Sequence, residues 1–273
     1  MKPVAIRVNN ENNEFQAIET LRRNRARRRK AGEFFVEGVR AITQAVETGW
    51  PVHALVYSRE KRLSDWAERM IASSGAARLI EMPLALVEKL SQKEDSSELL
   101  AVVGIPPDDL LRIPVERRGL VVLLDRLGSP GNIGAIMRSC DALGADGLIV
   151  SGHSADLYDP ETVRATTGSF FSVPAVRVES HQALLGWIAA RKAAPGGLQV
   201  VGTSAKASLP LREVDLRRPT LLLVGSETHG LSEAYKTLAD AMAVIPMGGY
   251  ASSLNVAAAA SIMLYEASRQ RDS

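Results

Sequence analysis

Polar residues that could act on a bound ligand follow three apolar segments in the second half of the chain. Two carboxamides, an arginine, a carboxylate and a serine make up this candidate set: Asn132, Arg138, Glu227, Ser253 and Asn255. Each comes shortly after a run of apolar residues that is typical of a buried strand. Because open α/β sheets bind ligands beyond the carboxyl ends of their strands, we expect these side chains to meet at one site.

The segment VVLLDRLGSPGNIGAIMRSCDALGADGLIV, residues 121–150, looks at first like a dinucleotide-binding turn. Its glycines, Gly128, Gly131 and Gly134, are spaced three apart, whereas the dinucleotide fingerprint is G-x-G-x-x-G. That fold also needs an acidic residue at the end of the next strand, where this chain has Ser151. An oxidoreductase with a nucleotide cofactor is therefore the weaker alternative.

Asn132 and Arg138 lie on a helix that is expected over residues 132–143. Asparagine is a favoured N-cap, which is the ordinary structural role for Asn132. Arg138 follows Gly134 by four residues, so its side chain is expected to lean over a residue without bulk, toward the mouth of the loop. Its apolar neighbours are expected to face the core: Ile133, Ile136, Met137 and Cys140.

Apolar strands and helical patterns alternate strictly in this half of the chain, which predicts an α/β fold with a parallel sheet covered on both faces. The expected strands are 119–125, 147–151, 173–178, 198–203, 219–225 and 242–246. The expected helices are 132–143, 160–167, 181–193, 231–240 and 253–268.

The first hundred residues also alternate and predict a smaller α/β domain. Three prolines and six charged residues interrupt the pattern in PPDDLLRIPVERRG, which marks a boundary. We therefore expect an N-terminal domain over 1–106, a linker over 107–118 and a catalytic domain over 119–273.

Composition narrows the class of protein. A length of 273 residues with 46% hydrophobic content is enough for two cores. The longest apolar run, 256–265, is about half of the roughly 20 residues that span a bilayer, and no secretory signal is recognised, so a cytoplasmic protein is expected. The single cysteine, Cys140, is expected to be a buried apolar residue rather than a nucleophile, and no metal site is expected.

The sequence LRRNRARRRK, residues 21–30, concentrates positive charge, with Arg or Lys at seven of ten positions. Such a density suits the phosphates of a nucleic acid, although a basic run can also be a solvated helix face. The predicted RNA-contacting residues are Arg22, Arg23, Arg25, Arg27, Arg28, Arg29 and Arg164.

Three segments in order resemble the signature motifs of the SpoU (TrmH) family of RNA ribose 2′-O-methyltransferases, a branch of the SPOUT class. They are SPGNIGAIMRSCDALGAD, LLLVGSETHGLS and IPMGGYASSLNVAAAASIMLYE. The segment RNRARRRKAGEFFVEGVRAITQAV is similar to the start of the RNA-binding domain that often accompanies this family's catalytic domain. The sequence departs from the family pattern at Thr228, His229 and Ala257.

The resemblance implies a catalytic domain with a deep trefoil knot, S-adenosylmethionine as cofactor and a homodimer formed through that domain. Gly225, Ile245 and Leu254 would line the cofactor pocket. The family proposal makes the arginine matching Arg138 the base that takes the hydroxyl proton. Because an arginine pKa lies above 12, we expect Arg138 instead to bind the target phosphate and polarise the hydroxyl, with Asn132, Ser253 and Asn255 orienting the nucleotide. Glu227 is expected to tolerate the departing positive charge or to support the loop.

The sequence therefore predicts transfer of a methyl group from S-adenosylmethionine to a ribose 2′-hydroxyl of a structured RNA, ribosomal or transfer. The alternative from another class is a catalytically silent RNA-binding or assembly protein on the same fold.

Overall fold

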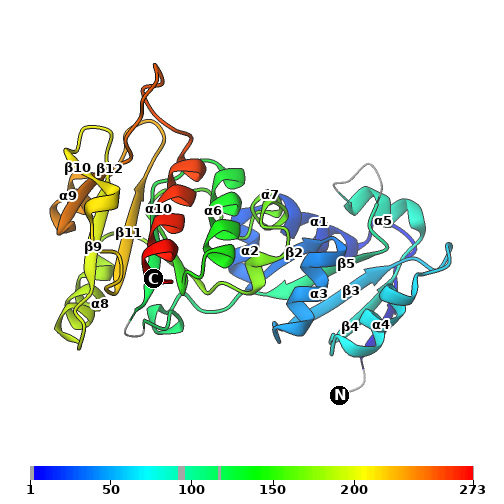
Figure 1. Cartoon of the computed structure of the whole chain (residues 1–273). Helices are drawn as coiled ribbons and strands as arrows, with labels where there is room; N and C mark the ends of the chain where they lie inside the picture. Colours follow the sequence, from blue (N-terminus) through cyan, green and yellow to red (C-terminus); the bar gives the residue numbers. More distant parts are fainter. Residues whose placement is uncertain (1–2, 92–95, 116–117, 273) are drawn as a thin grey trace. The chain divides into compact units, whose positions relative to one another are not determined.

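The computed structural model describes residues 3–91, 96–115 and 118–272, which form two units (Figure 1). Unit 1 holds the residues up to Pro106 together with Tyr158–Ser172. Unit 2 holds Pro107–Leu157 and the residues from Val173 onward. Positions 116 and 117 of the predicted linker lie outside the described residues.

Within the described part of unit 2, a seven-stranded parallel sheet runs in the order β10-β12-β9-β11-β6-β7-β8. Its strands are β6 (Leu120–Asp125), β7 (Gly147–Ser151), β8 (Ala175–Val178), β9 (Gln199–Thr203), β10 (Leu209–Pro210), β11 (Thr220–Gly225) and β12 (Ala241–Val244). The parallel sheet predicted from the sequence is confirmed. The strand β10 was not predicted, because two residues are too few to show a period.

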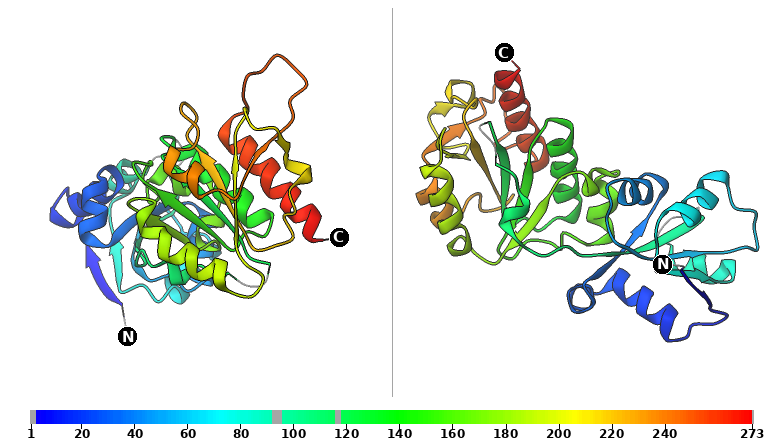
Figure 2. Two further views of the ribbon diagram at one scale, coloured as in Figure 1. Left: turned by 90° about the vertical axis from the view of Figure 1, so that its left-hand side faces the viewer. Right: turned by 90° about the horizontal axis from the view of Figure 1, so that it is seen from below.

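Helices cover both faces of this sheet, as predicted. They are α6 (Pro130–Ala142), α8 (Gln182–Ala193), α9 (Glu233–Leu238) and α10 (Val256–Arg271), with short 3-10 helices η1 (Leu110–Arg112) and η3 (Leu211–Glu213). The helices α6 and α10 lie side by side in Figures 1 and 2, and the hydroxyls of Ser139 and Ser261 meet at 2.8 Å between them. On the other face, Leu184 and Tyr235 pack with alternate strand residues such as Leu123.

The start of α6 differs from the prediction. Ser129 is its N-cap, since the Ser129 hydroxyl accepts a hydrogen bond from the backbone N–H of Asn132 at 3.2 Å, and Pro130 takes the first helical position. Proline fits there because its missing N–H would have no partner in the first turn. Asn132 therefore lies inside the first turn, which frees its side chain for other contacts.

Residues 107–115 are grouped with unit 2, and one of them, Ile113, anchors this mostly exposed segment. Ile113 is fully buried in that core, and Val115 packs against it. A Cβ at Gly147 would meet Ile113 Cγ2 at 2.6 Å, so β7 begins with a glycine where this side chain crosses it. Because prolines and charged residues flank Ile113, the sequence pattern did not identify it as a core residue.

In the described part of unit 1, a five-stranded mixed sheet runs in the order β1-β4-β3-β5-β2. Its strands are β1 (Val4–Arg7), β2 (Glu33–Glu37), β3 (Val52–Tyr57), β4 (Arg78–Glu81) and β5 (Leu99–Gly104). Its helices are α1 (Asn13–Arg23), α2 (Arg25–Ala31), α3 (Val39–Glu47), α4 (Asp65–Ser73), α5 (Leu84–Leu90) and α7 (Pro160–Ala165), with the 3-10 helix η2 (Ser169–Phe171). Strand β5 pairs antiparallel with β2 and β3, while β4 pairs parallel with β1 and β3.

The segment Tyr158–Ser172 folds into unit 1, although the sequence placed it in the catalytic domain. Its rings join an aromatic cluster with ring centroids 5.0–6.3 Å apart: Phe34, Trp50, Tyr158, Phe170 and Phe171. The indole N–H of Trp50 also donates to the carbonyl oxygen of Phe171 at 3.1 Å. Large aromatic side chains contribute strongly to a small core, so unit 1 depends on a segment from far along the chain.

Two arginines of the basic run make structural contacts within unit 1, and their role as RNA contacts stays a prediction. Arg28 is only 2% exposed, and its guanidinium donates to the carbonyls of Leu21 at 2.8 Å and Arg22 at 3.0 Å and to Asp159 Oδ2 at 3.2 Å. Arg22 donates to the carbonyl of Leu90 at 2.9 Å, at the end of α5, and partial burial lowers its pKa. The last carbonyls of a helix have no partner within the helix and attract cations.

No helix among the residues described here combines the length and the apolar character needed to cross a membrane. The trefoil knot stays a prediction.

We predict that Arg28→Met destabilises unit 1 by about 2 kcal/mol, because the Leu21 and Arg22 carbonyls would remain without this donor. Urea unfolding followed by the fluorescence of Trp50 and Trp66 measures the change. The matched control is Arg29→Met, an exposed arginine of the same helix, which should change stability by less than about 0.5 kcal/mol. Equal stabilities of the two variants would contradict the structural role.

Candidate functional site

The pairing of β6 with β11 brings the first two motifs together. The two strands are parallel and in register from Leu120 opposite Thr220 to Asp125 opposite Gly225. Their carboxyl ends therefore lie at the same level of the sheet edge, and the loops that follow them emerge side by side. The loop after β6 leads to α6, and the loop after β11 carries Glu227.

A chain of hydrogen bonds joins residues from all three motifs. The Asn132 amide donates through Nδ2 to Glu227 Oε1 at 2.6 Å, and Asn255 Nδ2 donates to Asn132 Oδ1 at 3.4 Å. Asn255 is also the N-cap of α10, where its Oδ1 accepts from the backbone N–H of Ala257 at 2.9 Å. The structure thus brings together three of the predicted site residues, Asn132, Glu227 and Asn255.

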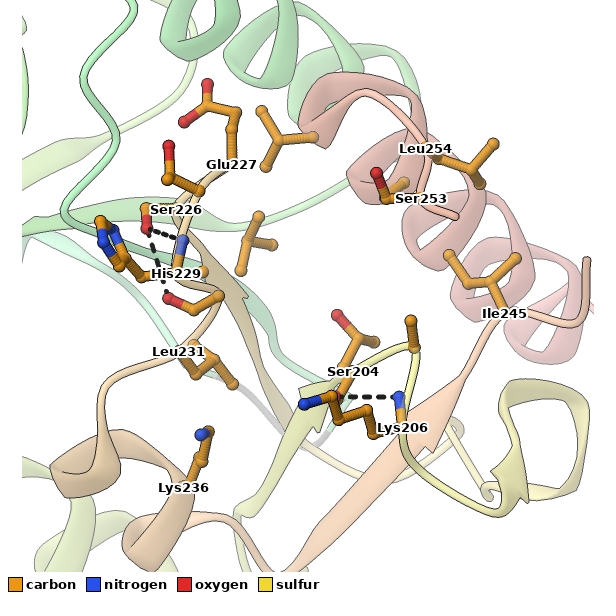
Figure 3. Close-up of a pocket in the computed structure, with 18 of the residues that line it drawn as sticks. Ser204, Lys206, Ser226, Glu227, His229, Leu231, Lys236, Ile245, Ser253 and Leu254 are labelled. Carbon is orange, nitrogen blue, oxygen red and sulfur yellow. Dashed lines mark hydrogen bonds between the residues drawn. The ribbon is translucent and has the colours of Figure 1, made fainter. Parts of the chain in front are cut away.

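A pocket of about 430 Å³ opens in unit 2 beside these hydrogen-bonded residues (Figure 3), and we call it the edge pocket. It is lined by the end of β9 and the loop after it, the end of β11 and its loop, Lys236, the segment between β12 and α10, and the first turn of α10. The lining residues are Thr203, Ser204, Ala205, Lys206, Val224, Gly225, Ser226, Glu227, Thr228, His229, Gly230, Leu231, Lys236, Ile245, Met247, Ser253, Leu254, Val256 and Ala259. Figure 3 shows Ile245, Ser253 and Leu254 on one side and Ser226 and His229 on the other. All three residues predicted to line a cofactor pocket are members of this set.

Gly225 is required by a close approach of the backbone. A Cβ at this position would lie 2.2 Å from the carbonyl carbon of Gly230 and 2.2 Å from the nitrogen of Leu231. The loop closes back on the strand because Ser226 and Gly230 exchange backbone hydrogen bonds at 3.2 and 2.9 Å. Gly230 has a φ of 63°, which glycine adopts without steric cost. The pocket wall at Gly225 is therefore formed by main-chain atoms.

Sequence reasoning missed two residues that hold this loop. Asp125 ends β6 and is only 2% exposed, and its Oδ2 accepts from the backbone N–H of Ser232 at 2.7 Å. Arg126 donates to the Asp125 carboxylate at 3.0 Å and to the carbonyl of Gly230 at 3.3 Å. Arg126 has a φ of 57°, an unfavourable conformation for a residue with a side chain. The signal was an acidic residue at the end of an apolar strand, directly before the first motif.

Of the two remaining predicted site residues, Ser253 lines the edge pocket, and neither Ser253 nor Arg138 is part of the hydrogen-bonded chain among the described residues. Arg138 is exposed on α6 and does not line the edge pocket, while its predicted apolar neighbours are fully buried. His229 is exposed at the pocket, and its backbone N–H donates to the Ser226 hydroxyl at 3.2 Å. The structure therefore does not show Arg138 reaching into the pocket of its own chain.

The structure offers neither a metal cluster nor a reactive thiol among the residues that it describes. No group of three or more His, Cys, Asp or Glu side chains is placed to hold a metal ion within residues 3–91, 96–115 and 118–272. Cys140 is fully buried, and this burial raises the pKa of its thiol to about 12. A thiol that stays protonated is a poor nucleophile.

Comparison with known proteins decides the family. Residues 119–265 match the SpoU rRNA Methylase family, and residues 12–101 match the SpoU L30e-like domain. The chain belongs to the SpoU rRNA methylase family. It is 50% identical over 98% of its length to the 23S rRNA (uridine(2479)-2′-O)-methyltransferase of Streptomyces viridochromogenes, 94% of which is covered.

Solved structures of SpoU methylases have the same fold. The S. viridochromogenes SpoU methyltransferase AviRb in complex with AdoMet matches with a TM-score of 0.92 and 51% identity, over 96% of this chain and 99% of that one. An AdoMet-bound rRNA methyltransferase from Sinorhizobium meliloti matches with a TM-score of 0.86 and 31% identity, over 97% and 98% of the two chains. The matches confirm the predicted fold class, S-adenosylmethionine as cofactor and RNA ribose 2′-O-methylation as the reaction.

We predict that Asp125→Asn weakens binding of S-adenosylhomocysteine about tenfold, because the Asn amide would face the Ser232 or Arg126 donors with a donor of its own. The loop that forms the pocket wall would lose one anchor. Isothermal titration calorimetry measures the dissociation constant. Asp141→Asn, an exposed carboxylate on α6, is the control and should bind like the wild type. Unchanged affinity in Asp125→Asn would show that the loop needs no such anchor.

Proposed function

We propose that this chain methylates a ribose 2′-hydroxyl of 23S rRNA, which is the substrate given in the name of its S. viridochromogenes relative. The observation that carries the proposal is the convergence of Asn132, Glu227 and Asn255 beside the edge pocket. Ribosomal RNA as the substrate places the enzyme in the cytoplasm. The mapping experiment below identifies the nucleotide that is methylated.

The edge pocket fits S-adenosylmethionine in chemistry and in size. Main-chain atoms at Gly225 and the apolar side chains of Ile245 and Leu254 would hold the adenosine part, while the hydroxyls of Ser204 and Ser226 offer polar contacts. A volume of about 430 Å³ lies within the range of pockets that bind small cofactors. The bound cofactor supplies a methyl group activated by its positively charged sulfur.

The polar residues beside the pocket would orient the RNA ribose. Asn132 has both ends of its amide engaged, by Glu227 and by Asn255, so its orientation is fixed before RNA binds. The Glu227 carboxylate thereby acts through Asn132 and also brings negative charge to the pocket. Preorganised groups of this kind reduce the cost of aligning a weak nucleophile with the methyl group. Ser253 lines the same pocket and is exposed to an incoming ribose.

Arg138 would bind a phosphate of the target strand. It is exposed on α6, and an exposed arginine is a permanent cation with five N–H donors. Binding a phosphate and polarising the neighbouring hydroxyl requires that charge, whereas removal of a proton requires the neutral form. Exposure therefore favours the phosphate-anchoring role over the role of base.

The exposed part of the basic run would contact the RNA backbone. Arg23, Arg27 and Arg29 are exposed on α1 and α2, and Arg164 is exposed on α7 of the same unit. Arg23 forms an ion pair with Glu19 at 3.0 Å, and its side chain remains 65% exposed. Arg25 is half-buried at the start of α2. The contribution of Arg25 is therefore expected to be smaller than that of the exposed arginines.

The catalytic unit would form a homodimer through α10. Ile262 and Tyr265 of this helix are 39% and 60% exposed, on a helix whose opposite side is buried against unit 2. Met247 and Leu254, between β12 and α10, expose further apolar surface. Apolar residues exposed together on one surface mark an interface.

We predict that total RNA from a strain lacking this protein loses one ribose methylation in 23S rRNA, found by mapping 2′-O-methyl positions. The wild-type gene should restore that methylation. Loss of a methylation only in transfer RNA would move the substrate to the other class, and an unchanged map would support the catalytically silent alternative.

In a methyl-transfer assay with purified enzyme and 23S rRNA, Arg138→Ala should lower kcat by roughly a hundredfold or more, because a group that stabilises charge near the reacting atoms would be lost. Its affinity for S-adenosylhomocysteine should stay near that of the wild type. Arg138→Lys keeps the charge without the bidentate fork, so partial rescue supports phosphate anchoring, and rescue that grows with pH supports a base. Full turnover in Arg138→Ala would exclude both roles.

We predict that the double variant Ile262→Glu, Tyr265→Glu sediments as a monomer where the wild type sediments as a dimer. Two buried carboxylates without partners would cost more than the interface gains. Leu185→Glu, on α8, changes an exposed apolar residue away from α10 and should leave the dimer intact. A dimer that survives the double variant would place the interface elsewhere.

A further inference from the structure

A second pocket lies in unit 1 between α1 and α2, and we call it the α1–α2 pocket. Its volume is about 450 Å³, similar to that of the edge pocket. It is lined by one face of α1, by two residues of α2 and by the first residue of β2: Asn13, Gln16, Ala17, Thr20, Leu21, Arg27, Ala31 and Glu33. All of these residues belong to the L30e-like unit, outside the site described above.

The lining combines apolar surface with hydrogen-bonding groups that are not used by the fold. Ala17, Leu21 and Ala31 contribute carbon atoms against which a flat ring can pack. Within the described chain, the carboxamides of Asn13 and Gln16 make no side-chain hydrogen bond, although the neighbouring Asn12 uses its side chain to cap α1. Each free carboxamide offers one acceptor and two donors to a ligand.

Arg27 is the cation of this pocket. Arg22 and Arg28, from the same basic run, donate hydrogen bonds to backbone carbonyls, as described above. The Arg27 guanidinium, in contrast, is exposed and has no hydrogen bond or ion pair with any residue that the structure describes. A free guanidinium beside free carboxamides matches a ligand that has both an anionic group and polar ring edges.

The carboxylate of Glu33 makes the pocket electrostatically asymmetric, with a negative group at Glu33 and a positive group at Arg27. Its Oε1 lies 2.7 Å from His53 Nδ1, which holds the negative group in place at the start of β2. A phosphate would be repelled there and attracted to Arg27. A nucleotide bound in the pocket would therefore place its phosphate at Arg27 and its base beside the carboxamides and the apolar surface.

We propose that the α1–α2 pocket receives an unpaired nucleotide of the substrate RNA and gives the enzyme part of its sequence preference. The inference rests on the proposed function, since it takes the substrate to be 23S rRNA. Sequence-specific RNA binding targets bases that are splayed out of the helix, by hydrogen bonds to their edges. Phosphate contacts alone position an RNA without reading its sequence, so the carboxamides carry the preference.

The test compares two RNAs with the full-length enzyme. Deproteinised 23S rRNA from the deletion strain is the substrate, and deproteinised 16S rRNA is the structured competitor. In filter binding, the double variant Asn13→Ala, Gln16→Ala should lose roughly tenfold or more in affinity for 23S rRNA, the scale of one or two base-edge contacts. Its affinity for 16S rRNA and for S-adenosylhomocysteine should not change. A general loss of folding would lower both RNA affinities.

Arg27→Ala probes the phosphate contact. It should weaken binding to both RNAs and reduce the slope of log affinity against log salt by about 0.7, the value for one phosphate of a single strand. The matched controls are Asn10→Ala, an exposed carboxamide outside the pocket, and Arg69→Ala, an exposed arginine of α4. Both controls should bind like the wild type.

Two failures have different meanings. If the wild type prefers 23S rRNA and methylates it while the double variant keeps that preference, the pocket proposal is wrong and the proposed function stands. If the wild type neither prefers nor methylates 23S rRNA, the proposed function is wrong and the pocket proposal falls with it.

Discussion

The in-register pairing of β6 with β11 is the constraint on which the catalytic unit depends. It sets Asp125 opposite Gly225, so the two loops that follow these strands must share one edge of the sheet. Asp125 and Arg126, at the end of β6, hydrogen-bond to the second loop, and Asn132 hydrogen-bonds to the same loop from the first turn of α6. A shift of one residue between these strands, about 3.3 Å, would move the donors and acceptors of these hydrogen bonds out of bonding distance.

The site is assembled mainly from neutral amides and main-chain atoms. Gly225 permits the backbone to approach itself, and Asn132 and Asn255 join the three motifs without a buried ion pair. A carboxamide has no ionisable proton, so Asn132 and Asn255 themselves offer the same donors and acceptors as the pH changes. The departures from the family pattern fit this design. Ala257 contributes only its backbone N–H to the Asn255 cap, and His229 donates to Ser226 only through its backbone N–H.

Unit 1 shows that one basic segment can serve two purposes. Arg22 and Arg28 stabilise helix ends and a carboxylate of the segment Tyr158–Ser172, whereas Arg27 and Arg29 remain exposed. The helix α2 explains the division. Residues one or two positions apart on a helix point in different directions, so a continuous run of arginines must distribute its charges over buried and solvated faces.

The sequence by itself determined the parallel sheet, its helices on both faces, the family and the three motifs, because these depend on local periodicity and on residues close in the chain. It also grouped Gly225, Ile245 and Leu254, which line one pocket in the structure. Only the tertiary structure decided that Arg28 is buried, that Ile113 belongs to a core and that Tyr158–Ser172 folds with unit 1. Each of these depends on a partner far along the chain: Asp159, Gly147 and Phe34, respectively. Neither charge nor periodicity near a residue identifies such a partner, which is why the sequence could not place these residues.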